Sequence, residues 1–125
     1  MSVLIDTSVL IDVLRGHAAA TKVLRDARLA GPLHASELTR LEILAGMRPA
    51  EAGATRALLE IIDWRPLDGQ IAEMAGELGR QWLLGNRGID AADLAIAATA
   101  VVLEVPLLTR NVKHFPMFAG LAAPY

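Results

Sequence analysis

Acidic residues in three separated stretches of the chain have the types and surroundings of a divalent-cation site. They are Asp6, Glu42, Asp90 and Asp93. Carboxylate oxygens favour hard cations such as Mg²⁺ and Mn²⁺ over zinc. Two carboxylates about 4 Å apart repel each other by roughly 4 kcal/mol at an effective dielectric constant of 20, and a bound cation would offset that cost. Such an ion can activate water and neutralise a phosphate, which is the chemistry of phosphodiester hydrolysis.

Asp6 allows two interpretations. It follows Val3 to Ile5, a short aliphatic run that is typical of a strand buried on both faces, and a helical pattern begins directly after it. Asp is a favoured helix N-cap, so a capping role is open on local evidence. In an open α/β sheet, however, binding sites lie beyond the carboxyl ends of the strands, which favours a ligand at Asp6.

Glu42 belongs to a helix predicted over 37–47. The apolar stripe predicted for this helix consists of Leu38, Leu41 and Ala45. Because Glu42 lies on or beside that stripe, we expect a buried carboxylate that needs a cation or hydrogen bonds, since an unpaired buried charge costs several kcal/mol. The alternative is an exposed Glu42 paired with Arg40 or Arg48.

Asp90 and Asp93 precede the most apolar stretch of the chain, predicted as a buried helix over 90–103. Their spacing resembles a capping box, in which Asp90 is the N-cap and Asp93 interacts with the helix dipole. A helix this apolar must begin deep in the molecule. We therefore also expect its first-turn carboxylates near the strand ends.

The rest of the chain alternates short aliphatic runs with helical patterns. Strands are predicted at 3–5, at 33–35, within 61–67 and at 106–109, with a further edge strand in the tail from Leu121. Helices are predicted from a Thr7 or Ser8 cap to Leu14, then over 18–30, 37–47, about 50–61, from Ile71 and over 90–103, with a turn at 86–88 and a short helix or turn at 111–115. This order predicts an α/β fold with a mostly parallel sheet covered on both faces.

The composition narrows the class of protein. A length of 125 residues with 54% hydrophobic residues and a mean hydropathy of +0.40 predicts one domain with an ample core. The absence of cysteine excludes disulfides and thiolate metal sites. No apolar run is long enough to span a membrane and the N-terminus does not resemble a signal peptide, so we expect a cytoplasmic protein. A net charge of −2 argues against coating nucleic acid by charge alone.

Four stretches together resemble a known family. They are LIDTSVLIDVL at 4–14, SELTRLEILAGM at 36–47, IDAADLAIAATA at 89–100 and LLTRNVKHF at 107–115. In content, order and spacing they resemble PIN-domain ribonucleases, and within them the VapC toxins of type II toxin–antitoxin systems. The resemblance covers essentially the whole chain. It implies a single PIN-like domain over 1–125, built as a three-layer α/β/α sandwich with a short, mostly parallel sheet of four to five strands.

The resemblance also implies roles for individual residues. The family's catalytic, metal-binding acids fall on Asp6, Glu42 and Asp93, and Asp90 is a further metal ligand, directly or through water. Secondary site candidates are Thr7, Ser8, Thr109 and Asn111. Many PIN domains carry an acid where Asn111 stands, so this departure weakens the case for a second metal ion.

The activity that the resemblance implies is endonucleolytic cleavage of RNA by metal-activated water, with Mg²⁺ or Mn²⁺. Such toxins are usually homodimers that a small VapB-like antitoxin holds inactive, in a heterotetramer or a larger complex. One alternative is a PIN fold that binds RNA or protein without cutting. Another is transfer through an aspartyl phosphate, but Ser8 stands where that chemistry would place a second Asp.

Several polar residues are assigned no catalytic role. Asp12 is predicted to be solvated or salt-bridged, and His17, His34 and His114 to be structural or surface residues, with His114 the least secure because it follows Asn111. The basic residues that could line an RNA path are Arg15, Arg40, Arg48, Arg87, Arg110 and Lys113. As isolated positions, most of them are expected to be ordinary surface charges.

Overall fold

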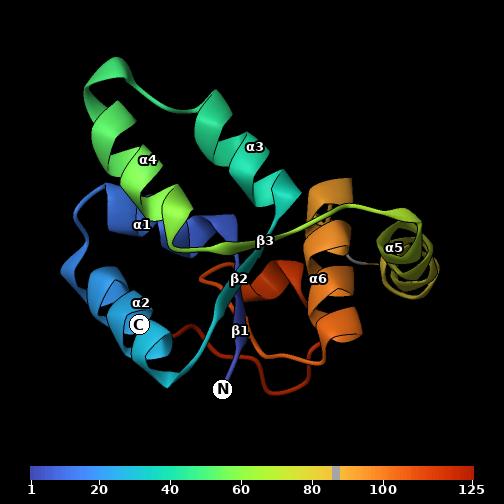
Figure 1. The fold of residues 1–125 in the computed structure, drawn as a ribbon. Coiled ribbons are helices and arrows are strands. Elements are labelled where there is room, and N and C mark those ends of the chain that lie inside the picture. Colours follow the sequence, from blue (N-terminus) through green and yellow to red (C-terminus); the bar gives the residue numbers. More distant parts are fainter. Residues whose placement is uncertain (86–87) are drawn as a thin grey trace.

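A parallel sheet of four short strands runs through the middle of the molecule (Figure 1). The computed structural model describes residues 1–85 and 88–125. The strands are β1 (Val3–Ile5), β2 (Leu33–Ser36), β3 (Asp63–Arg65) and β4 (Leu107–Leu108). Their order is β3-β2-β1-β4, and each of the three pairings is parallel. The α/β class and the parallel sheet predicted from sequence are therefore confirmed.

Helices follow the strands in the predicted order. They are α1 (Thr7–Leu14), α2 (Ala18–Ala30), α3 (Glu37–Ala45), α4 (Ala52–Glu60), α5 (Gly69–Trp82) and α6 (Ala91–Leu103), with short 3₁₀ segments η1 (Pro49–Glu51) and η2 (Val112–His114). Pro49 opens η1, which leads directly into α4. Asp68, which the sequence analysis did not single out, caps α5 by accepting a hydrogen bond from the Ile71 amide. The turn predicted at 86–88 falls largely outside the described residues.

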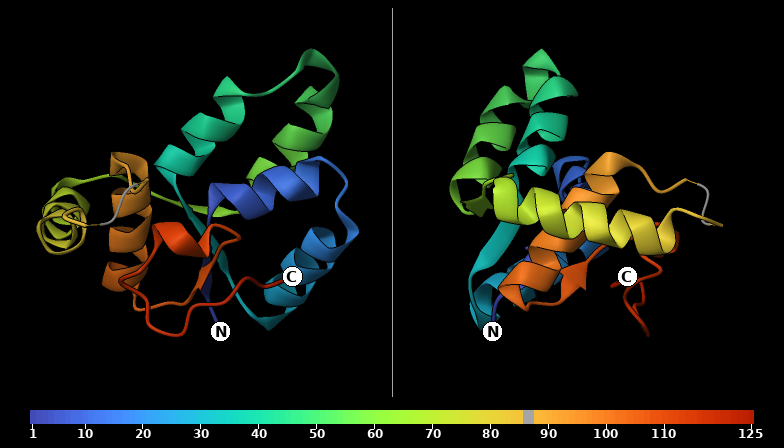
Figure 2. Two further views of the ribbon diagram at one scale, coloured as in Figure 1. Left: turned by 180° about the vertical axis from the view of Figure 1, so that it is seen from behind. Right: turned by 90° about the vertical axis from the view of Figure 1, so that its right-hand side faces the viewer.

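The tail from Leu121 does not form the predicted edge strand, and β4 is the last strand on its side of the described sheet. Pro124 has no amide hydrogen for a strand ladder. The tail instead crosses the back of the molecule (Figure 2) and brings Tyr125 against His17 at the start of α2. Side-chain contacts rather than sheet pairing hold this segment.

The cap predicted for α1 is also corrected. Asp6 occupies the N-cap position but makes no side-chain cap hydrogen bond, and Thr7 and Ser8 lie inside the first turn. The hydroxyl of Thr7 donates to Glu42 and that of Ser8 to Asp6, so both are committed to other partners. Contacts from elsewhere in the fold have replaced local capping.

Alternation along β1 divides the core in two. Val3 and Ile5 pack into a cluster with α1, α2, α3 and α4, whereas Leu4 packs with α5 and α6 on the other face. Successive strand side chains point to opposite faces, so three consecutive aliphatic residues supply both cores. Each such buried side chain stabilises the fold by about 1.5–3 kcal/mol. The result is the predicted three-layer arrangement.

Helix α6 is the most buried helix, as its apolar sequence predicts. Every residue from Leu94 to Ala100 is buried. Its alanines and Gly79 of α5 permit close packing, since a Cβ at Gly79 would lie 3.2 Å from Leu94 Cδ1. This packing fixes the beginning of α6, and with it Asp90 and Asp93, against the body of the domain. In the part of the chain that the structure describes, none of the helices is both long and apolar enough to cross a bilayer.

Candidate active site

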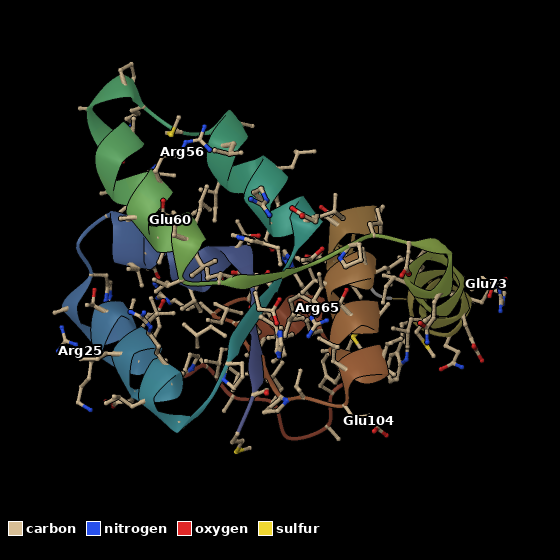
Figure 3. All side chains as sticks on the ribbon, in the orientation of Figure 1. Arg25, Arg56, Glu60, Arg65, Glu73 and Glu104 are labelled. Carbon is tan, nitrogen blue, oxygen red and sulfur yellow. The ribbon has the colours of Figure 1, made fainter. Side chains whose placement is uncertain are left out.

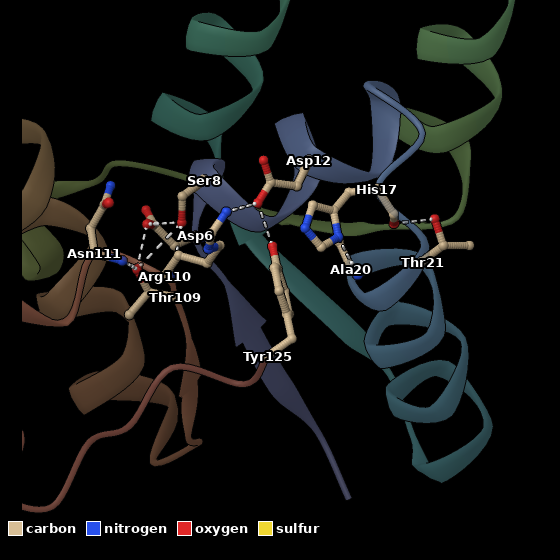
Figure 4. A network of polar contacts seen from close by, with 10 residues as sticks. All are labelled: Asp6, Ser8, Asp12, His17, Ala20, Thr21, Thr109, Arg110, Asn111 and Tyr125. Atoms are coloured by element: carbon tan, nitrogen blue, oxygen red, sulfur yellow. Dashed lines mark hydrogen bonds and ion pairs between the residues drawn. The ribbon is translucent and has the colours of Figure 1, made fainter.

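Asp6 lies at the carboxyl end of β1 and is only 4% exposed. Its Oδ2 accepts hydrogen bonds from the hydroxyls of Thr109, at 2.7 Å, and Ser8, at 2.8 Å (Figure 4). Both donors are neutral, and no described basic side chain lies within ion-pair distance of this carboxylate. A buried carboxylate with only neutral partners is costly, and a cation would relieve that cost.

The two hydroxyls that hold Asp6 are themselves held by the chain that follows β4. Ser8 Oγ accepts a hydrogen bond from the Arg110 amide at 3.2 Å, and Thr109 Oγ1 accepts one from the Asn111 amide at 2.9 Å. Each hydroxyl therefore both accepts and donates, which fixes its proton toward Asp6. The secondary candidates Ser8 and Thr109 thus orient this carboxylate, whereas Asn111 contributes through its backbone amide.

Glu42 is not buried on an apolar stripe, so that prediction was wrong. The buried residues of α3 are Thr39 and Ile43, while Leu41 is 60% exposed and Glu42 is exposed. Hydrophobicity misplaced the stripe because one of the buried positions is a polar residue, Thr39, whose hydroxyl lies 3.0 Å from that of Thr7 in α1. Glu42 nevertheless faces α1, because its Oε1 accepts a 2.8 Å hydrogen bond from the Thr7 hydroxyl.

Asp90 and Asp93 form the predicted capping box. The Asp93 amide donates to Asp90 Oδ1 at 2.9 Å, and the Asp90 amide donates to Asp93 Oδ2 at 3.1 Å. The Asp93 side chain is 13% exposed and also lies 3.2 Å from Nδ1 of His114. Burial raises the pKa of the Asp93 carboxyl above its ordinary value, while the Asp90 amide and His114 act in the opposite direction.

The acids are arranged as three hydrogen-bonded groups rather than one cluster. Asp6 is joined to Ser8 and Thr109, Glu42 to Thr7, and Asp93 to Asp90 and His114. As they are placed, no three described Asp, Glu or His side chains lie close enough to surround an ion. The all-oxygen donor set still fits Mg²⁺, which keeps several waters and takes only one or two carboxylates directly.

The raised pKa of Asp93 predicts a stability effect in metal-free protein. When the pKa of a carboxyl is higher in the folded state than in the unfolded state, its protonated form stabilises the fold. This stabilisation is fully present below the unfolded pKa and is lost as the pH rises through the folded pKa. Asp93→Asn, measured in EDTA, should therefore have a higher free energy of unfolding than the wild type at neutral pH. The difference should shrink as the pH falls toward the ordinary Asp value of 3.8.

Urea titrations at several pH values measure this difference. Asp26→Asn is the control, because Asp26 is exposed on α2, where it pairs with Lys22. An Asp93→Asn protein that is less stable than the wild type at neutral pH would contradict the inference that burial of the ionised Asp93 carboxylate destabilises the fold.

The residues given no catalytic role behave largely as predicted. Asp12 accepts hydrogen bonds from Arg110 Nη1 at 3.0 Å and from the Tyr125 hydroxyl at 2.7 Å, which together lower its pKa. His17 caps α2 by accepting a hydrogen bond from the Ala20 amide. His34 is buried and accepts one from Arg65 Nε, and burial lowers its pKa.

Two features of the site were missed from the sequence. His114 reaches Asp93, and its place three residues after Asn111 was the available signal. The contact among Asp12, Arg110 and Tyr125 joins three separate segments. Asp12 lies one helical turn after Ser8 and so shares its face of α1, but nothing in the sequence singles out Tyr125.

Comparisons with known proteins agree with this fold. Residues 3–120 match the family model described as PIN domain. The chain is 45% identical over 123 residues to Ribonuclease VapC19 of Mycobacterium tuberculosis, covering 98% of both chains, and 41% identical to Ribonuclease VapC10 of the same species, covering 98% of this chain and 92% of the relative. A solved toxin–antitoxin complex from Klebsiella pneumoniae contains a chain with a TM-score of 0.82 and 28% identity, with 98% of both chains covered. The chain belongs to the PIN domain family.

Proposed function

We propose that this protein is a VapC-type toxin, an endoribonuclease that cleaves cellular RNA by metal-activated water. Its two similar full-length relatives are named ribonucleases, and both cover nearly the whole chain. The single observation that carries the proposal is the buried carboxylate of Asp6, held by two hydroxyls at the carboxyl end of a parallel strand. A site of this kind suits phosphodiester hydrolysis better than passive binding, because a binding module gains nothing from an uncompensated buried charge.

In this proposal Asp6, Glu42 and Asp93 would hold one Mg²⁺ ion, one or two of them directly and the rest through water. Mn²⁺ can replace the Mg²⁺ ion, and Asp90 contributes through water. When bound, the ion supplies an activated water and neutralises charge on the scissile phosphate. A single ion is favoured over two because Asn111 offers a neutral amide where a second ion would need a carboxylate.

The protein's own side chains prepare this site. Ser8 and Thr109 fix the orientation of Asp6, Thr7 draws Glu42 toward the beginning of α1, and His114 lies against Asp93. Fixed carboxylates reduce the reorganisation that accompanies charge development during the reaction. Strand β1, which directly precedes Asp6, is buried on both faces, and this burial limits the movement of the strand.

The proposed partner is a VapB-like antitoxin. The Klebsiella pneumoniae relative was solved in a toxin–antitoxin complex, and its similarity extends over 98% of this chain. We propose further that residues 1–125 form one PIN domain that acts in the cytoplasm on RNA, and that it forms a homodimer, assembling with antitoxin into a heterotetramer or a larger complex.

Metal addition and removal test the proposed reaction. Purified protein should cleave RNA in Mg²⁺ or Mn²⁺, lose cleavage when EDTA is added, and recover it when excess Mg²⁺ follows. Denaturing gels and mapping of new RNA 5′ ends measure the products. Cleavage that persists in EDTA would contradict the metal-dependent mechanism. Tight RNA binding without cleavage in either metal would instead support the alternative, a PIN fold that binds RNA or protein without cutting.

A further inference from the structure

Arg110 differs from the other basic residues that could contact RNA. It directly follows Thr109, and its amide donates to the Ser8 hydroxyl, so it is the neighbour of one residue that holds Asp6 and is hydrogen-bonded to the other. Arg15 pairs with Glu51 along α1, and Arg40 pairs with Glu37 while lying over the ring of Trp64. Arg87 lies outside the described residues. Arg110 is therefore the described arginine whose main chain is bonded into the Asp6 site.

A polar hollow lies beside the buried carboxylate. It is lined by Ser8, Ile11, Asp12, Arg110 and Asn111. Ser8 contributes to both the hollow and the Asp6 hydrogen bonds, so the hollow begins where the candidate metal site ends. An RNA chain whose scissile phosphate sits at Asp6 would place a neighbouring phosphate in or near this hollow.

Two segments that are distant in sequence, α1 and the C-terminal tail, hold the Arg110 side chain through Asp12 and Tyr125 (Figure 4). Its Nη1 donates to Asp12 Oδ2 at 3.0 Å, and its Cζ lies 5.2 Å from the centre of the Tyr125 ring. The Tyr125 hydroxyl donates to the same Asp12 oxygen at 2.7 Å, and its ring lies 5.1 Å from that of His17. An arginine side chain has about 2 kcal/mol of rotamer entropy, and these contacts remove part of it before any ligand binds.

The guanidinium retains donors for a ligand. It has five N–H groups, of which the Asp12 contact uses one, and the side chain is 47% exposed. A planar, always charged fork of this kind matches the oxygens of a phosphate. Asp12 orients the group beside the hollow that Arg110 lines.

We propose that Arg110 binds an RNA backbone phosphate adjacent to the one cleaved, and that Tyr125 is a positioning residue that holds the guanidinium toward the hollow. This proposal deepens the proposed function and rests on it for the identity of the substrate. It assigns to the Asp12–Arg110–Tyr125 contact a role in substrate binding rather than in the chemical step.

Binding in the absence of cleavage tests this proposal. The probe is a short fluorescein-labelled single-stranded RNA, titrated in EDTA and followed by fluorescence anisotropy at several salt concentrations. Arg110→Gln should weaken binding on the order of tenfold and reduce the slope of log K against log salt by about 0.7, the value for one lost contact to a single strand. Arg25→Gln is the matched control, because it removes the same charge from the outer side of α2 (Figure 3).

Tyr125 is tested in both backgrounds. Tyr125→Ala should weaken RNA binding in the wild type and have no further effect in Arg110→Gln, because its contribution acts through the guanidinium. Tyr125→Phe, which keeps the ring and removes the hydroxyl, should have an intermediate effect. Equal effects of Tyr125→Ala in both backgrounds would show a merely structural role and would overturn its assignment as a positioning residue.

The outcomes separate this proposal from the proposed function. If the Arg110→Gln variant binds RNA with the wild-type affinity and the wild-type slope of log K against log salt, the proposal is overturned. This holds even if the wild type cleaves RNA in Mg²⁺. Wild-type protein that fails to bind the probe also overturns it. Arg110-dependent binding without cleavage in Mg²⁺ or Mn²⁺ supports the phosphate site and refutes the nuclease assignment alone.

Discussion

Asp6→Asn is expected to lower the rate of RNA cleavage on the order of 10³-fold or more while leaving the fold intact. Asparagine has the same shape, and its side-chain oxygen can still accept hydrogen bonds from Ser8 and Thr109. It lacks the negative charge that would bind the ion. Removing a buried charge without a cationic partner should not destabilise the protein, so thermal unfolding in EDTA should occur at the wild-type temperature or above.

Cleavage assays and thermal unfolding on the same preparations measure this prediction. Asp26→Asn removes one carboxylate from an exposed ion pair on α2 and should leave cleavage unchanged. Glu42→Gln and Asp93→Asn should also abolish cleavage if each contributes to the ion. Full activity in Asp6→Asn would refute the proposed site. If Asp6→Asn lost activity because it unfolded, the loss would show a structural role of Asp6 and not a catalytic one.

Phe115→Ala should reduce the free energy of unfolding by about 3–5 kcal/mol. Phe115 is 1% exposed and is the largest fully buried side chain among residues 1–85 and 88–125. It packs in the core on the α5–α6 side of the sheet, together with Leu4 of β1. Truncation leaves a cavity at the point where η2 joins that core, and the close packing of α6 restricts collapse around it.

Urea denaturation measures the loss, with Phe118→Ala as the control. The Phe118 ring lies 6.4 Å from that of Phe115 but is only partly buried, so its truncation should cost less. A loss below about 1 kcal/mol for Phe115→Ala would contradict its place in the core.

Local sequence patterns predicted the parts of the fold that depend on local physics. The alternation of aliphatic runs and helical periods located the four strands and the bounds of α2 and α6. The Asp90 and Asp93 capping box was recognisable because it spans a single helical turn. In each case the sequence signal lies within a few neighbouring residues, even where the strands then pair with distant segments.

The prediction for α3 failed for a specific physical reason. Hydrophobicity assigned Leu41 to the core, whereas the buried face carries Thr39, whose hydroxyl is satisfied by Thr7 from another helix. A threonine can be buried when a distant partner meets its hydrogen bond, and sequence periodicity cannot detect that partner. The same limit hid Tyr125, which reaches Asp12 across 113 positions of sequence.

The pairing of β1 with β4 has a consequence for synthesis of the chain. Asp6 is oriented by Thr109, 103 positions later, and β1 obtains its β4 neighbour only when residues 107 and 108 are available. Domains fold during translation as their segments emerge, and contacts between distant segments form late. A ribosome-bound nascent chain that already includes all four acids still lacks the strand that fixes the first of them. The order of translation would thus delay nuclease activity until residues 107–109 have left the ribosome.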